Sequence, residues 1–163
     1  MESMKYLFDT NIFITSKNQL PADIWPTFWQ RMAELIRDGR IYSSIKVKEE
    51  IERGEDELTA WMKRHSVEGF YIPLDGDIMK QYAATQNWAN RCKNFKPEAL
   101  RTYADVADAY LVATASAQNM VLVTYEKSDP TCRKRVMIPD ACKALGVKYC
   151  DLNVALRELN VII

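Results

Sequence analysis

The amino-acid sequence predicts an α/β fold, a three-layer α/β/α arrangement around a mostly parallel central sheet of four to five strands. Short apolar runs alternate with longer segments of helical periodicity, and glycine or proline separates most of them. Strands that alternate with helices connect through right-handed crossovers and pair in parallel. The strongest strand candidate, residues 120–124, contains four apolar residues and no charge, as expected for a strand covered on both faces.

The size and composition are typical of one globular domain, which we place at residues 1–163. Of the 163 residues, 48% are hydrophobic and 27% are charged, which excludes a disordered or fibrous chain. The 22 basic residues balance 22 acidic ones, so bulk positive charge does not hold the protein to nucleic acid. A local basic patch remains compatible with this balance.

The sequence also predicts a cytoplasmic protein without a membrane partner. Its first six residues do not resemble a signal peptide, and no apolar run approaches the about 20 residues that span a bilayer. The four cysteines form no C-x-x-C pair and have no nearby histidine, which argues against a zinc site. We expect these thiols to be reduced and partly buried.

In the first half of the chain, Lys5–Phe8 is predicted to be a buried strand that ends at Asp9. Ser44 has the residue type of a helix N-cap. The further elements expected here are a helix over Pro26–Arg37, a strand over Ile41–Ser43, a helix from Ser44 to Arg53, a short helix over Glu55–Arg64, and a strand or apolar loop over Phe70–Ile72.

In the second half, the longest helical pattern covers Pro97–Ala117, with apolar residues aligned along one face. The other elements expected here are a helix over Asp75–Arg91, a strand over Met120–Thr124, a helix over Pro139–Leu145, a strand over Val147–Cys150 and a terminal helix over Leu152–Leu159.

Carboxylates follow two of these strands. Asp9 comes directly after the first strand and Glu126 two residues after Thr124, so a parallel sheet opens both onto its carboxyl edge. Two further acidic groups, Glu49–Glu50 and Asp105/Asp108, lie on helices between them. In one continuous helix, Asp105 and Asp108 share a face with Cβ atoms about 5–6 Å apart.

Asp108 stands in an otherwise apolar stretch, residues 107–113, that should face the sheet. Carboxylates are rarely buried without a partner, and a cluster of them favours a bound cation. Oxygen-only sites suit Mg²⁺ or Mn²⁺, and such a site supports phosphodiester hydrolysis by activating water. The single histidine, His65, lies between helices and is expected at the surface, so catalysis would not use a histidine acid–base pair.

Four segments, in this order along the chain, resemble the motifs of the PIN domain family: residues 6–13 (YLFDTNIF), 47–51 (VKEEI), 107–115 (ADAYLVATA) and 122–126 (LVTYE). The resemblance implies a parallel-sheet α/β/α fold and a Mg²⁺- or Mn²⁺-dependent endoribonuclease. It also implies, as for many small members, a toxin of a toxin–antitoxin pair that is neutralised by an antitoxin protein and forms a homodimer.

Carried over to this sequence, the resemblance implies an acidic catalytic pocket of Asp9, Glu50, Asp108 and Glu126, with Asp9, Asp108 and Glu126 as metal ligands. Asn11 would steady Asp9 or a water, and Thr124 and Asp105 would support the pocket. The sequence departs from the family pattern at Glu126, where aspartate is usual, and in the altered acidic segment that follows, residues 127–130. Asp129 is therefore an alternative fourth ligand.

Four of these acidic residues also have a simpler interpretation. Asp9 is a common residue type for capping the following helix. Glu50 and Asp105 fit solvated helix faces, and Glu126 fits an ordinary loop charge.

Of the tryptophans, Trp25 and Trp29 are expected in the core, with a dimer contact as the alternative.

Two basic runs are candidates for contact with single-stranded or looped RNA. Trp88 and Phe95 lie among the first run and are candidates for stacking on bases. Solvated surface is the alternative for both runs, whose residues are Arg91, Lys93, Lys96 and Arg101, then Arg133, Lys134 and Arg135.

Two other functions compete with the ribonuclease. One is a catalytically degenerate PIN-like module that binds RNA or protein, with Glu126 as a sign of a decayed pocket. The other is a phosphatase with Asp9 as nucleophile. The second is disfavoured because Asn11 stands where the Asp-x-Asp pattern of haloacid-dehalogenase enzymes has its general acid.

Overall fold

The computed structural model describes residues 4–163, which contain one parallel five-stranded sheet with the order β3-β2-β1-β4-β5. The strands are β1 (Tyr6–Phe8), β2 (Ile41–Ser44), β3 (Tyr71–Ile72), β4 (Val121–Val123) and β5 (Tyr149–Cys150). All four strand pairings are parallel. The predicted sheet is thus confirmed. Residues 1–3, part of the segment in which we expect no signal peptide, lie outside the described residues.

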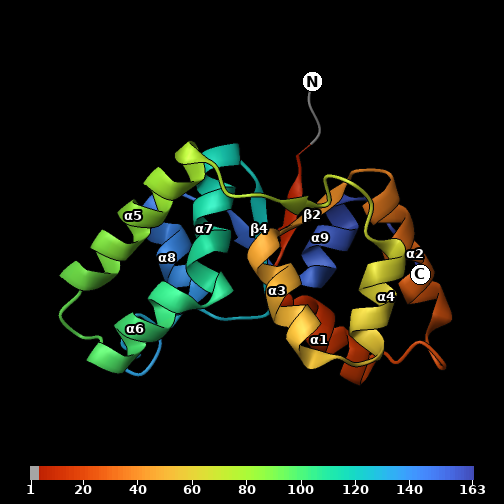
Figure 1. The fold of residues 1–163 in the computed structure, drawn as a ribbon, viewed down its shortest axis with the longest axis horizontal. Helices are drawn as coiled ribbons and strands as arrows, with labels where there is room; N and C mark the ends of the chain where they lie inside the picture. Colours follow the sequence, from red (N-terminus) through yellow and green to blue (C-terminus); the bar gives the residue numbers. More distant parts are fainter. Residues whose placement is uncertain (1–3) are drawn as a thin grey trace.

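Helices cover both faces of this sheet. Figure 1 shows α5 to α8 gathered on one side and α1, α2, α4 and α9 on the other, which confirms the three-layer α/β/α arrangement. Their bounds are α1 (Thr10–Gln19), α2 (Pro26–Arg37), α3 (Ile45–Gly54), α4 (Glu57–His65), α5 (Gly76–Arg91), α6 (Pro97–Asp105), α7 (Ala107–Gln118), α8 (Ile138–Leu145) and α9 (Leu152–Glu158).

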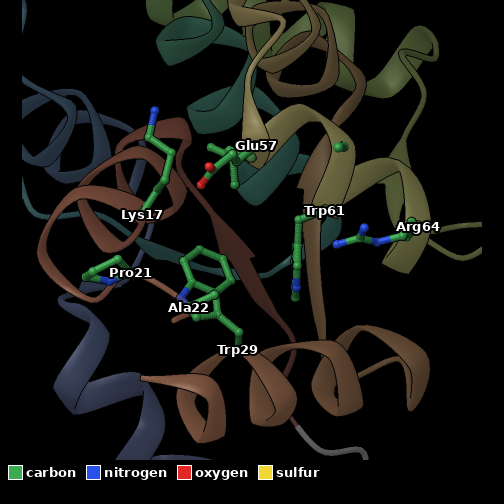
Figure 2. A pocket seen from close by; sticks show the side chains of 9 residues that line it. Lys17, Pro21, Ala22, Trp29, Glu57, Trp61 and Arg64 are labelled. Atoms are coloured by element: carbon green, nitrogen blue, oxygen red, sulfur yellow. The ribbon is translucent and has the colours of Figure 1, made fainter. Parts of the chain in front are cut away.

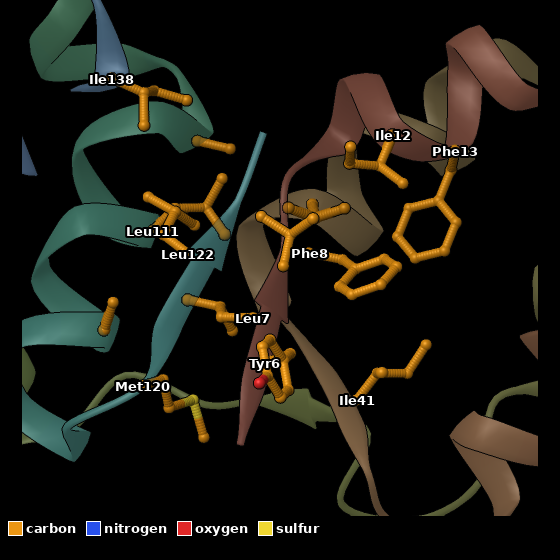
Figure 3. Packing of buried hydrophobic residues seen from close by; sticks show 14 of the residues in the cluster. Tyr6, Leu7, Phe8, Ile12, Phe13, Ile41, Leu111, Met120, Leu122 and Ile138 are labelled. Atoms are coloured by element: carbon orange, nitrogen blue, oxygen red, sulfur yellow. The ribbon is translucent and has the colours of Figure 1, made fainter. Parts of the chain in front are cut away.

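The core forms around the two central strands. Leu7 and Phe8 of β1 and Leu122 of β4 are completely buried, because helices pack against both faces of these strands. Figure 3 shows Leu122 beside Leu111 of α7 on one side, and Phe8 close to Phe13 of α1 on the other. The rings of Phe8 and Phe13 lie 5.9 Å apart between centroids. Side chains of β1 and β4 therefore contact helices of both layers.

Local signals place most elements where the sequence predicts them. Helix α2 has the predicted bounds, and the Ser44 hydroxyl accepts a hydrogen bond from the backbone N–H of Lys46 at the start of α3. Of residues 70–72, left open between strand and loop, Tyr71–Ile72 form the short edge strand β3. Trp29 is buried as expected, but Trp25 is 48% exposed, so its predicted place in the core is wrong.

The long helix predicted over residues 97–117 is interrupted. Val106 adopts an extended conformation (φ −82°, ψ 167°) and separates α6 from α7. The interruption frees the backbone N–H of Ala107, which donates to the Glu50 carboxylate instead of to a helical carbonyl (2.9 Å). Asp105 and Asp108 therefore lie on different helices, and the prediction that they share one helix face is wrong.

In residues 4–163, no helix is long and apolar enough to cross a membrane.

Candidate active site at the carboxyl edge of the sheet

The candidate site lies where the central strands β1 and β4 end. After β1 the chain continues into α1 on one side of the sheet, and after β4 it continues toward α8 on the other. Such a point, where neighbouring parallel strands lead to opposite faces, is the usual ligand-binding crevice of an open α/β sheet. The backbone N–H of Asp9 donates to the Val123 carbonyl (3.0 Å), which holds the two strand ends together.

Asp9 is the most deeply buried acidic residue of the site, with 1% of its surface exposed. It occupies the N-cap position of α1, yet its side chain makes no capping hydrogen bond. Its Oδ2 instead accepts a hydrogen bond from the Thr124 hydroxyl (2.9 Å). The simple capping interpretation therefore does not explain this side chain.

The pKa of Asp9 is raised from 3.8 to about 7. Burial is the largest cause, and the negative charges of Asp108 and Glu126 add to it. The Thr124 hydroxyl and the nearby backbone N–H of Asn11 oppose the shift. Asn11 thus lowers the pKa of Asp9 through its backbone N–H and not through its side chain. A carboxylate repelled by two others in a dry site is one that a cation would stabilise.

Glu126 lies in the same pocket and is held from two sides. Its Oε1 accepts a hydrogen bond from the backbone N–H of Ile138 at the start of α8 (3.2 Å), and its backbone N–H donates to the Thr124 hydroxyl (3.1 Å). Its side chain is only 6% exposed. Burial, followed by the charge of Asp108, raises its pKa to about 7. Glu126 is therefore not an ordinary loop charge.

Asp108 stands in the first turn of α7, with 15% of its side chain exposed. Burial raises its pKa, the charge of Glu50 adds to this effect, and Arg135 opposes it. The predicted acidic residues thus lie close enough together for the charges of Asp108 and Glu126 to raise the pKa of Asp9, although they come from α7, from the loop after β4 and from the residue after β1.

Glu50 borders this group and uses its carboxylate to join two helices. Its Oε2 accepts a hydrogen bond from the Thr10 hydroxyl in α1, and its Oε1 accepts one from Ala107 N–H at the start of α7, both at 2.9 Å. The solvated-face interpretation of Glu50 is therefore wrong. Its contacts position the turn that carries Asp108. Thr10, which sequence reasoning passed over, follows Asp9 directly and is 5% exposed.

Arg135 is the predicted RNA-binding residue whose contacts differ most from the prediction. Its Nη2 lies 2.9 Å from Oε2 of Glu126 and 3.3 Å from Oδ2 of Asp108. Burial lowers the pKa of this guanidinium, but the charges of Glu126 and Asp108, and then of Asp9, outweigh burial, so the pKa is raised. The sequence predicted Arg135 as one of a run of RNA-contacting residues, but its guanidinium lies against the acidic pocket.

The donor set of the pocket fits a hard divalent cation in chemistry. It offers only carboxylate and hydroxyl oxygens, and Mg²⁺ typically uses one or two carboxylates and keeps several waters. In residues 4–163, however, no three acidic, histidine or cysteine side chains are close enough together to hold a metal ion as they stand. The charge of Asp108 and Glu126 is compensated by Arg135 instead.

The other supporting residues lie outside the pocket. Asp105 is exposed at the end of α6, which agrees with the solvated interpretation. Asp129 is also exposed, and its Oδ1 accepts a hydrogen bond from the Thr131 hydroxyl (3.0 Å), so the structure brings Glu126 and not Asp129 to Asp108. Sequence reasoning missed Asp140, a nearly buried residue in the first turn of α8. Its carboxylate accepts hydrogen bonds from Ser128 and from Asp129 N–H, and this fixes the loop that follows Glu126.

The remaining predicted basic residues form one surface, because the two runs meet in space. The backbone N–H of Lys96 donates to the Arg133 carbonyl (2.9 Å), and the Asn94 side chain donates to two carbonyls of the facing loop. We call this region the basic surface; its members, all exposed, are Arg91, Lys93, Lys96, Arg101, Arg133 and Lys134. Arg101 pairs with Glu98 at 3.6 Å.

The aromatic residues of the first run are less accessible than predicted. Trp88 and Phe95 pack edge to face, with ring centroids 6.1 Å apart, and both are partly buried against the core. Both rings thus pack against the core and against each other. His65 lies against the ring of Trp61 (4.6 Å between centroids) and is not part of the acidic pocket.

A separate cavity of about 270 Å³ lies between α1, α2 and α4. Figure 2 shows the rings of Trp29 and Trp61 facing it, with Lys17, Glu57 and Arg64 around them. None of the predicted site residues lines this cavity, so it is distinct from the acidic pocket.

Comparison with known proteins gives a family and a fold. The profile of a family described as "Domain of unknown function (DUF4411)" matches residues 6–163. No curated protein matches the sequence.

Several solved structures share the fold at low sequence identity. VapBC2 from Rickettsia felis, bound to a DNA fragment from its promoter, has a chain with a TM-score of 0.57 and 13% identity, over 91% of this chain and 98% of that one. FitAcB from Neisseria gonorrhoeae gives 0.51 and 18%, over 88% and 95%. VapBC-1 from nontypeable Haemophilus influenzae gives 0.51 and 18%, over 91% and 98%. The fold is therefore the PIN-like one that the sequence resemblance implies.

Proposed function

Given that the chain belongs to the DUF4411 family and has a PIN-like fold, we propose that it is a metal-dependent endoribonuclease, the toxin of a toxin–antitoxin pair. The observation that carries this proposal is the meeting of Asp9, Asp108 and Glu126 at the carboxyl edge of the sheet. The charge of Asp108 raises the pKa of both Asp9 and Glu126, and carboxylates with pKa values shifted in this way are typical of a functional site.

In this proposal Asp9, Asp108 and Glu126 hold a Mg²⁺ or Mn²⁺ ion. When bound, the ion would supply a Lewis acid that activates water and stabilises the charge of the cleaved phosphodiester. A pocket that contains carboxylates and hydroxyls but no histidine suits this chemistry. The repulsion that raises the pKa of Asp9 and Glu126 would be relieved by the same ion.

The chain's own residues then have distinct tasks. Thr124 orients Asp9 by donating to Oδ2 and holds the backbone of Glu126 with the same hydroxyl. Glu50 is a positioning residue, because its two oxygens fix the starts of α1 and α7 around Asp108. The basic surface offers exposed cations to the phosphates of RNA next to the loop that carries Arg135.

The partners follow from the same resemblance. Two of the similar structures come from VapBC assemblies, which supports a cognate antitoxin for this chain. We include in the proposal a homodimer and a cytoplasmic location, where the RNA substrate and the antitoxin would be met.

The test is cleavage of a labelled RNA of mixed sequence in Mg²⁺, Mn²⁺ or EDTA. Cleavage that requires metal and falls on the order of 100-fold or more in Asp108→Asn supports the proposal, since loss of even an outer-shell partner lowers activity about 10–100-fold. Asp105→Asn is the matched control, because this exposed carboxylate lies three residues away and outside the pocket. Cleavage that survives Asp108→Asn contradicts the assigned site.

One observation favours a second candidate function, a non-catalytic PIN-like module that binds RNA or protein. Arg135 already compensates the charge of Asp108 and Glu126, as it would in a pocket that no longer holds a metal. Tight RNA binding without cleavage in either metal would support this candidate and contradict the nuclease.

A further inference from the structure

Arg135 competes for the oxygen atoms that a metal would need. Its Nη2 contacts Oε2 of Glu126 at 2.9 Å and Oδ2 of Asp108 at 3.3 Å, so one guanidinium bridges two of the three proposed ligands. The contacted carboxylates are nearly buried, at 6% and 15% exposure of their side chains. Hydrogen bonds between ionised groups are roughly twice as strong as those between neutral groups. A cation that enters the pocket must break them.

The same side chain is free to leave. Arg135 is 49% exposed, and it lies beside two exposed members of the basic surface, Arg133 and Lys134, in the loop before α8. A guanidinium binds a phosphate through two parallel hydrogen bonds as well as it binds a carboxylate. A nucleic-acid phosphate bound at this loop could therefore replace the carboxylates of Asp108 and Glu126 as the anion that pairs with Arg135.

We propose that Arg135 is an internal counter-ion that a divalent cation must displace from Asp108 and Glu126, and that pairing of Arg135 with a nucleic-acid phosphate releases the pocket for that cation. The inference rests on the proposed metal-dependent function and adds to it a coupling between the two ligands. Metal and nucleic acid then strengthen each other's binding, by equal factors, because each stabilises the arrangement in which Arg135 has left the carboxylates.

The test measures Mn²⁺ binding to the full chain by calorimetry or by electron paramagnetic resonance, without any cleavage step. Arg135→Gln should bind Mn²⁺ roughly tenfold more tightly than the wild type, because the competing charge-assisted contacts are gone. Arg157→Gln is the matched control: it makes the same change at an exposed arginine of α9, which lies outside the basic surface and makes no ion pair within the described residues. It should stay within about twofold of the wild type.

The coupling is tested by repeating the titration with a phosphorothioate single-stranded oligonucleotide, which keeps the backbone charge and resists hydrolysis. The oligonucleotide should tighten Mn²⁺ binding several-fold in the wild type and in Arg157→Gln. It should have little effect in Arg135→Gln, where no guanidinium blocks the pocket. An equal gain in all three proteins overturns the coupling.

The outcomes separate this inference from the proposed function. Equal or weaker Mn²⁺ binding by Arg135→Gln than by a wild type that does bind Mn²⁺ refutes the counter-ion role and leaves the metal-dependent nuclease standing. Absence of Mn²⁺ binding in both proteins refutes both. If Arg135→Gln does not fold, Arg135→Met decides: it keeps part of the apolar stem but not the charge, so its Mn²⁺ affinity should exceed that of the wild type.

Discussion

The burial of Asp9 predicts an unusual dependence of stability on pH in the metal-free protein. Its pKa is raised from 3.8 to about 7 by burial and by the charges of Asp108 and Glu126. Between about pH 4 and pH 7 the folded state therefore binds more protons than the unfolded state. The contribution of Asp9 to the free energy of unfolding therefore falls as the pH rises through this window.

The magnitude follows from the shift. One pKa unit corresponds to about 1.36 kcal/mol, so ionising Asp9 destabilises the folded protein by up to about 4 kcal/mol at pH 8. The repulsion is shared with Glu126, whose pKa is also raised to about 7, so we expect about 2–4 kcal/mol for Asp9 alone. Asp9→Asn removes this charge and keeps an oxygen that accepts the hydrogen bond from Thr124.

The assay is urea unfolding, followed by circular dichroism, at pH 5 and pH 8 in EDTA. At pH 8, Asp9→Asn should be more stable than the wild type by about 2–4 kcal/mol, and the difference should shrink toward pH 5. The lowered pKa of His65 adds stability as the pH rises, but this contribution is the same in both proteins and cancels in their difference. Asp105→Asn controls for the loss of one surface carboxylate.

Two results would refute this reasoning. If Asp9→Asn is less stable than the wild type at pH 8, the ionised carboxylate is stabilised by the pocket and not repelled by it. If the difference between the two proteins does not change between pH 5 and pH 8, Asp9 does not titrate in this window.

Three further substitutions test the remaining contacts. Thr124→Val should lower the free energy of unfolding by about 1–3 kcal/mol at pH 8, measured in urea, because the buried Asp9 carboxylate loses its donor; less loss is expected at pH 5, where Asp9 is protonated. Glu50→Ala should lower the free energy of unfolding by about 1–2 kcal/mol and speed hydrogen exchange at the Ala107 amide. Its control is Glu49→Ala at an exposed position, which should change the free energy of unfolding by less than about 0.5 kcal/mol. Phe8→Ala should cost about 3–5 kcal/mol in the same urea assay because it opens a cavity in the fully buried core, and a loss below about 1 kcal/mol would contradict that packing.

The sequence by itself determined the elements whose signals are local. The apolar spacing and Pro26 define α2, and Ser44 starts α3, because a helix end depends on the few residues around it. The location of Asp9 and Glu126 at the same edge of the sheet was also predictable, since both follow strands of a parallel sheet. These inferences required only the order of strands and helices.

The tertiary structure alone decided which charges meet and where the long helix stops. The break at Val106 leaves the backbone N–H of Ala107 without a helical partner, and the Glu50 carboxylate accepts its hydrogen bond instead. Glu50 lies 57 residues from Ala107 in the chain, and no periodicity in residues 97–117 signals that contact. In the sequence Arg135 belongs to a basic run, yet in the structure its guanidinium lies against Asp108 and Glu126. Charge pairs form wherever folding brings opposite charges within a few ångströms in a dry setting, and that distance is a property of packed segments, not of any stretch of sequence.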